Sequence, residues 1–140
     1  MNGSAAPGRL IGILGAFPDI RFDLLADPGV HPHDLTALAG RFANLTVSGT
    51  CWRNASASGL AETLGHRVQS APAVKVSAFS SDAASVEWLH GRLQFVKKSM
   101  GSALGWLIED GFFEEDEIPP LIRQILHDSP RNILGLGDPA

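Results

Sequence analysis

Three short apolar stretches, each followed by a longer helical pattern, constrain the fold of this chain most strongly. They lie at residues 20–25, 44–49 and 74–79, and the third carries β-branched valines typical of a strand. Strands that alternate with helices imply a parallel sheet with right-handed crossover connections. The sequence therefore predicts an α/β fold.

The helices are predicted from apolar residues that recur three and four positions apart. We expect them at about 34–42, 56–70, 85–110 and 116–127, after a helical turn within 9–16 and before a last short turn from Ser129. The longest carries a stripe that we expect to be buried throughout, made of Leu89, Leu93, Val96, Met100, Leu104 and Leu107. Residues 1–8 are expected to form a flexible N-terminus, which leaves residues 9–140 as a single α/β domain.

Length and composition narrow the class of protein. At 140 residues the chain is long enough for one domain with a sizeable core. Its formal net charge of −4 argues against nucleic acid, or an anionic membrane, as the main partner, because both bind basic surfaces. No apolar run approaches the roughly 20 residues that cross a bilayer, and the N-terminus lacks the pattern of a signal peptide. With one cysteine, Cys51, and hence no internal disulfide, we expect a cytoplasmic protein.

Side chains suited to chemistry follow each of the predicted strands. In a parallel sheet the carboxyl ends of the strands lie on one side, where α/β folds place their active sites. Asp27 with the loop of His31 and His33, residues 51–53 and residues 80–82 would therefore share one rim. Arg53 could hold a substrate carboxylate through paired donors, and Trp52 could wall the pocket. A surface arginine and a core tryptophan are the ordinary alternatives.

Asp82 has two readings. As an acid at the end of a strand, it could bind a metal ion or act as a general base. As an aspartate just before the longest helix, it could cap that helix by accepting a hydrogen bond from a free backbone N–H. Position alone favours the cap.

The histidines and the cysteine are not expected to carry chemistry. His31 and His33 have the two-residue spacing of a metal-binding pair on a strand, but they precede a helix and are expected on a solvated loop. The other histidines fall in or beside predicted helices and are expected to be structural; they are His66, His90 and His127. Cys51 has no neighbouring base to activate it, so we expect no thiol nucleophile.

The order and spacing of several segments carry a family resemblance. The first segment is residues 42–49, which lead to Trp52. The next two are residues 72–75 and 79–82, at the two ends of the third strand, and the last two are residues 111–113 and 125–131, near the end of the chain. From about residue 17 to residue 136, this pattern resembles the C-terminal part of the amidohydrolase superfamily, in particular its uronate (glucuronate) isomerase-like members. The resemblance implies a partial (β/α)8 TIM barrel with about three C-terminal βα units, parallel strands and C-terminal helices.

The resemblance also implies roles for the residues of the rim. Asp82 takes the place of the aspartate that ends the eighth strand of the barrel, where it binds the metal or acts as the catalytic base. Trp52 matches the tryptophan that lines the substrate pocket, and Arg53 would bind an anionic group of the substrate. A divalent metal, Zn²⁺ or Mn²⁺, is implied only together with ligands that this chain does not contain. Ala83 stands where uronate isomerases tend to carry an arginine.

Chain length decides how the resemblance is interpreted. A full (β/α)8 barrel takes about 250 residues, so a chain of 140 residues is expected to form a half-barrel. We therefore expect the C-terminal portion of a metal-dependent amidohydrolase-related hydrolase or uronate-type isomerase, inactive by itself and acting on a small, anionic substrate. Its open strand edges should lead it to associate with itself or with a complementary N-terminal half. The alternatives are a non-catalytic half-barrel interaction module and a small α/β ligand-binding domain.

Overall fold

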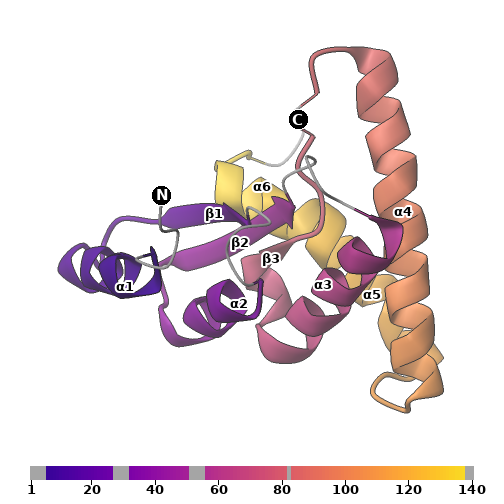
Figure 1. Ribbon diagram of the computed structural model, residues 1–140, viewed down its shortest axis with the longest axis horizontal. Helices are drawn as coiled ribbons and strands as arrows, with labels where there is room; N and C mark the ends of the chain where they lie inside the picture. The colour runs from indigo at the N-terminus through magenta and orange to yellow at the C-terminus, as the bar shows by residue number, and fades with distance from the viewer. Residues whose placement is uncertain (1–5, 27–31, 51–55, 82, 138–140) are drawn as a thin grey trace.

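The computed structural model describes residues 6–26, 32–50, 56–81 and 83–137 of the chain. Within them, three strands form one sheet in the order β1-β2-β3; they are β1 (Phe22–Ala26), β2 (Leu45–Thr50) and β3 (Val76–Ser77). Both pairs of neighbouring strands are parallel. Figure 1 shows the strands side by side, with helices packed along the sheet. The predicted α/β class with parallel strands is confirmed.

The helices follow the strands in the predicted alternation. They are α1 (Ala6–Ala16), α2 (Pro32–Arg41), α3 (Ala57–Ser70), α4 (Val86–Glu109), α5 (Ile118–Arg123) and α6 (Ser129–Leu134), with 3-10 turns η3 (Ala73–Lys75) and η4 (Glu115–Glu117) and a π-helical segment η5 (Gln124–Asp128). α1 begins at Ala6, inside the stretch for which composition predicts a flexible end. In the described part of the chain, no helix has both the length and the apolar character that crossing a membrane requires.

The two faces of the sheet differ because side chains alternate along each strand. On β2, Leu45 and Val47 turn to one face, where they are buried against Leu14 of α1 and Leu38 of α2. Thr46 lies between them in the chain and turns to the opposite face. α2 therefore packs along this face of the β1–β2 pair, and α1 lies at the amino ends of the two strands, as Figure 1 shows.

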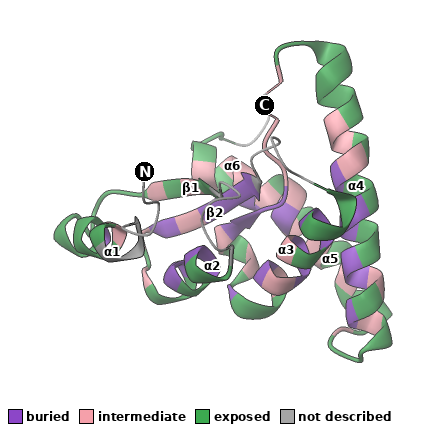
Figure 2. Ribbon diagram, in the orientation of Figure 1, coloured by how far each residue is buried: buried purple, intermediate pink, exposed green. Residues whose placement is uncertain are grey.

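A second core forms where α3, α4 and the C-terminal segment meet. Its buried members include Leu60 and Leu64 of α3, Met100 and Leu104 of α4, and Ile125 of η5. The apolar stripe predicted along α4 is buried only in part, since Leu89 is 38% exposed. Figure 2 shows the first turns of α4 exposed and later turns buried, because the first turns extend past the rest of the molecule.

β3 is shorter than the sequence predicts, because a strand is indicated over 74–79 and the ladder holds two residues. A 3-10 turn occupies the preceding residues, with the backbone N–H of Lys75 donating to the carbonyl of Pro72 at 2.9 Å. After the ladder, the N–H of Ala78 donates to the carbonyl of Ile125 in η5 at 3.0 Å. Other hydrogen bonds therefore limit the strand on both sides.

The carbonyl of Ile125 can accept from Ala78 because the helix is π-helical at this point. The N–H of Ser129 donates five residues back, to the carbonyl of Gln124. Pro130 follows and has no N–H to donate. Ile125 is thus left without its usual helical donor, and its carbonyl turns to Ala78 instead. The π segment anchors the C-terminal helices beside β3.

Candidate active-site rim

The side chains that the sequence predicts for the site lie outside the described residues. They are Trp52, Arg53 and Asp82, and Asp27 of the same predicted rim also lies outside the described residues. The structure does describe the frame from which they continue: the carboxyl ends of β2 and β3 and the helices α3 and α4 that follow these strands.

β2 ends in a bulge at Gly49. In the ladder with β1, Leu25 pairs with Ser48 and Ala26 pairs with Thr50, so Gly49 is an extra residue. Its φ of +30° lies in the left-handed region, which glycine adopts readily because it has no Cβ. Bulges bend a strand and are common next to active sites. The bulge redirects β2 just before residues 51–53.

Gly49 also lies against the segment that continues β3. A Cβ added at Gly49 would collide with the Cβ of Ser80 and lie 2.8 Å from the backbone nitrogen of Ser80. No side chain fits at this position without a shift of backbone. The absence of a Cβ therefore allows the ends of β2 and β3 to approach each other closely.

A buried arginine holds the bulge. Arg67 of α3 is fully buried, and its Nη1 donates to the carbonyl of Gly49 at 2.8 Å. Its Nε and Nη2 have no hydrogen-bond partner within the described structure. Burial lowers the pKa of Arg67 to about 10, with the carboxylate of Asp23 acting in the opposite direction. The guanidinium therefore keeps its positive charge at neutral pH.

A second arginine makes a similar contact one βα unit later. Arg92 of α4 is partly buried, and its Nη2 donates to the carbonyl of Ser80 at 3.3 Å. Its Nε is buried and also lacks a partner among the residues that the structure describes. In both units, an arginine on the helix reaches back to a backbone carbonyl at the end of the preceding strand. Two positive charges thus lie next to the rim.

Two histidines contact each other between α2 and α3. The rings of His33 and His66 meet edge to face, with centroids 3.8 Å apart and an angle of 82° between the planes. His33 lies in the first turn of α2 and not on a loop, because the helix begins at Pro32, a position where proline is tolerated. Burial, followed by the charges of His33 and Arg67, lowers the pKa of His66, while Glu62 acts in the opposite direction.

The helix after β3 is capped by Ser85. α4 begins at Val86, and the side chain of Ser85 accepts a hydrogen bond from the N–H of Trp88 at 3.3 Å. Asp82 is therefore not the N-cap residue of this helix, because Ser85 occupies the position directly before α4 and its side chain takes that role. Asp82 itself lies outside the described residues.

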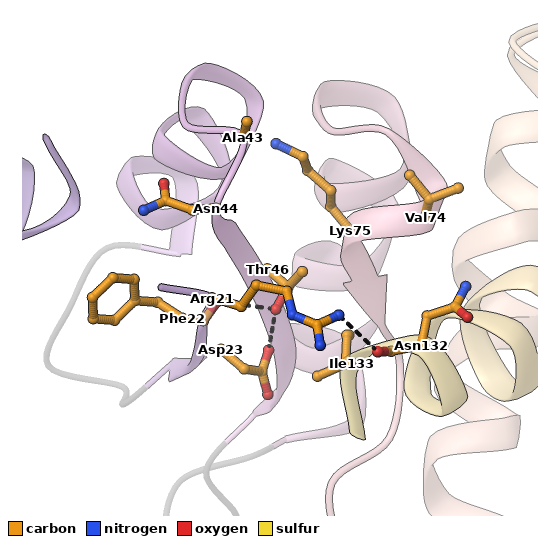
Figure 3. Close-up of a pocket in the computed structure, with 10 residues that line it drawn as sticks. All are labelled: Arg21, Phe22, Asp23, Ala43, Asn44, Thr46, Val74, Lys75, Asn132 and Ile133. Carbon is orange, nitrogen blue, oxygen red and sulfur yellow. Dashed lines mark hydrogen bonds between the residues drawn. The ribbon is translucent and has the colours of Figure 1, made fainter. Parts of the chain in front are cut away.

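The opposite end of the sheet holds a cavity of about 280 Å³, which Figure 3 shows. It is lined by Arg21, Phe22, Asp23, Ala43, Asn44, Thr46, Val74, Lys75, Asn132 and Ile133. The hydroxyl of Thr46 donates to the carboxylate of Asp23 at 2.8 Å, and Arg21 donates to the carbonyl of Asn132 at 3.4 Å. The ammonium of Lys75 donates to two carbonyls at the end of α2, at 2.8 and 2.7 Å. These polar groups serve the structure, and α/β enzymes place their chemistry at the other end.

A metal site is not formed by the described residues alone. Among them, no three histidine, cysteine, aspartate or glutamate side chains lie close enough to hold a metal ion. A catalytic metal usually has about three protein ligands. The metal implied by the family resemblance would thus need ligands other than the described side chains.

Sequence reasoning did not single out Arg67 and Arg92. Arg67 lies seven residues after Leu60 and three after Leu64, which places it on the buried face of α3. Arg92 lies three residues after Leu89 and so follows the apolar stripe of α4. The sequence could have indicated both arginines, because each is a charged residue at the spacing of the core residues of its helix. Charged side chains are rarely buried without a partner.

Comparison with known proteins identifies a fold. No protein-family model matches the sequence, and no curated protein sequence matches it. The structure, however, superposes on the uronate isomerase from Thermotoga maritima with a TM-score of 0.84 and 18% sequence identity. Its fold is that of part of a uronate isomerase. The match covers 95% of this chain, and the chain spans 30% of the length of that enzyme.

The fold match bears on the expected architecture. Three parallel βα units followed by C-terminal helices correspond to part of a TIM barrel, so the predicted partial barrel is confirmed. The predicted likeness to a uronate isomerase fragment is confirmed at the level of the fold. The described strand ends belong to the side of such a barrel that carries catalytic groups.

Proposed function

We propose that this chain is the C-terminal portion of a sugar isomerase of the uronate isomerase type, inactive until the rest of the barrel is present. The observation that carries the proposal is the match of 95% of this chain to 30% of a uronate isomerase, with a TM-score of 0.84. A (β/α)8 enzyme builds its site from several strand ends. The ends of β2 and β3 would supply one side of that site.

The proposed roles follow the order of the strand ends. Asp82, two residues after Ser80, would act as the base that moves a proton on the substrate. Arg53 would bind an anionic group of the substrate through paired donors, and Trp52 would wall the pocket. Because Ser85 caps α4, the carboxylate of Asp82 is not required there. Since Ala83 replaces the arginine that uronate isomerases tend to carry, recognition of the anion would rest on Arg53.

A divalent metal, Zn²⁺ or Mn²⁺, belongs to this proposal. When bound, such an ion polarises a substrate oxygen as a Lewis acid. Asp82 would be the ligand contributed by this chain, and the other ligands would come from the missing part of the barrel. The proton transfer assigned to Asp82 and the anion contact assigned to Arg53 do not depend on it.

The first turns of α4 offer a surface for the proposed partner. Val86 is 76% exposed, Trp88 is 50% exposed and Leu89 is 38% exposed, and all three are apolar. Figure 2 shows this end of α4 extending away from the rest of the molecule. A complementary N-terminal half would cover these side chains in a complete barrel, whereas the isolated chain would bury them by self-association.

Activity of the completed protein tests the proposed function. The chain co-expressed with the N-terminal part of its barrel should isomerise a uronate, and the chain alone should not. Asp82→Asn should lower the rate at least about 100-fold if the carboxylate moves the proton. The matched control Asp110→Asn, an exposed acid at the other end of α4, should leave the rate unchanged. A completed wild-type protein without turnover on uronates would overturn the proposal.

The second candidate is a non-catalytic interaction module, favoured by the exposed apolar end of α4. Metal analysis separates the two. Stoichiometric Zn²⁺ or Mn²⁺ in the completed protein, lost in Asp82→Asn, supports the enzyme. A completed protein that binds no metal and turns over no uronate, while the chain self-associates through α4, supports the module.

A further inference from the structure

We propose that Arg67 and Arg92 form an arginine clamp that positions the ends of β2 and β3. The role of this clamp in catalysis rests on the proposed function, because Trp52 and Asp82 follow these strand ends in the chain. Neither arginine is assigned a contact with substrate. Each acts through the strand end that it holds, so both are positioning residues.

The burial of Arg67 requires an explanation beyond packing. Its guanidinium is fully buried and positively charged, and two of its nitrogens lack hydrogen-bond partners in the described residues. Moving such a group out of water is strongly unfavourable, and an apolar side chain in its place is often neutral or stabilising. The hydrogen bond to Gly49 is the contact that only the arginine supplies.

A side chain can determine the orientation of the Gly49 carbonyl because this residue belongs to a bulge. The extra residue of a bulge is left out of the ladder, so the neighbouring strand does not determine its orientation. Nη1 of Arg67 fixes that orientation at 2.8 Å. The path of the chain at Thr50, the last residue of β2, depends on this peptide.

Arg92 extends the clamp to the next strand end. Its Nη2 donates to the carbonyl of Ser80, and Ser80 in turn packs directly against Gly49. α3 and α4, which carry the two arginines, share one apolar core. The two strand ends and the two helices therefore form one connected unit. Displacing either arginine should loosen both ends of the rim.

Hydrogen exchange on the full chain tests the clamp without any substrate. In Arg67→Met, amide exchange over residues 48–50 should rise about tenfold while the midpoint of chemical unfolding stays the same or increases. Arg92→Met should do the same over residues 79–81. The exposed Lys97→Met of α4 is the matched control and should change neither quantity.

Two results would overturn the clamp. One is unchanged exchange at the strand ends in both methionine variants. The other is a lowered unfolding midpoint with exchange raised evenly over α3 and β2, since that pattern means a structural arginine. If Arg67→Met fails to fold, Arg67→Lys provides the test instead, because lysine keeps the positive charge and one donor nitrogen. The lysine variant should show intermediate protection at residues 48–50, and wild-type protection there would also count against the clamp.

Activity of the completed protein gives a second readout. Arg67→Met acts on the strand end before the proposed anion-binding residue and should mainly raise KM. Arg92→Met acts on the strand end before Asp82 and should mainly lower kcat. A completed wild-type protein without activity would contradict the proposed function, but the exchange test of the clamp would still apply. If the completed protein is active and both methionine variants keep the wild-type kcat, KM and amide exchange, the clamp is contradicted and the proposed function is not.

Discussion

Gly49 and Ser80 touch where β2 and β3 reach the rim, since a Cβ on Gly49 would lie 2.8 Å from the backbone nitrogen of Ser80. This contact joins the ends of two parallel strands that belong to separate βα units. Arg67 holds one side of it and Arg92 the other. These contacts all lie at the end of the sheet that α/β folds use for chemistry.

Gly49→Ala should destabilise the protein by at least about 2 kcal/mol, from left-handed backbone strain together with overlap against Ser80. Chemical unfolding measures the change. Gly101→Ala is the control, because nothing lies near that position and alanine in the middle of α4 should add up to about 1 kcal/mol. Equal effects of the two substitutions would contradict the close contact.

Ser85→Ala should cost about 1 kcal/mol of unfolding free energy, since it removes the side chain that caps α4. Asp82→Ala should cost much less, because that acid is not the cap. Thermal or urea unfolding of both variants makes the comparison. A larger loss in Asp82→Ala than in Ser85→Ala would return Asp82 to a capping role.

Stability should fall as the solution is acidified through the range of histidine titration. Burial, followed by the charges of His33 and Arg67, holds the pKa of His66 below its ordinary value of 6.5, with Glu62 opposing. The unfolded chain then binds a proton more readily than the folded chain, so the free energy of unfolding should decrease below pH 6.5 and level off beneath the folded-state pKa.

Variants at two histidines check this pH dependence. His66→Gln should flatten the decrease in unfolding free energy, because glutamine does not titrate. His90→Gln, at an exposed position on α4, should leave the decrease as in the wild type. An identical slope in the wild type and His66→Gln would show that the titration of His66 is not its source.

Ser129→Ala should destabilise the C-terminal helices by about 1 to 2 kcal/mol. The hydroxyl of Ser129 is buried, donates to the carbonyl of Ala73 at 2.8 Å and accepts from Gln124 at 3.0 Å. Unfolding of this variant should be compared with Ser102→Ala, whose hydroxyl is exposed on α4. Similar stabilities for the two variants would mean that the π segment is not anchored through this serine.

Local periodicity predicts most of the elements of this fold. The strands before α2 and α3, and the helices 56–70 and 85–110, follow from apolar spacing because their own residues determine them. β3 does not follow, since its length depends on Ile125, a hydrogen-bond partner far along the chain. The position of His33 was misread for a local reason, because Pro32 was read as loop and instead opens α2.

The sequence predicts where the rim lies but not the contacts that hold it. The rule that parallel strands end on one side indicates where to look, and a glycine within a predicted strand hints at a bulge. The contacts of Arg67 and Arg92 join residues 18 and 12 positions apart in the chain. Their partners are backbone carbonyls, which carry no signature in the sequence. Tertiary packing therefore decides these contacts.

The nucleotide sequence just upstream of the Met1 codon tests the central claim most directly. If the chain is the C-terminal portion of a uronate isomerase-type barrel, the reading frame should continue upstream and encode a His-x-His pair after a strand. That pair would supply the metal ligands that the described residues lack. A stop codon and a promoter immediately before Met1 would contradict the claim.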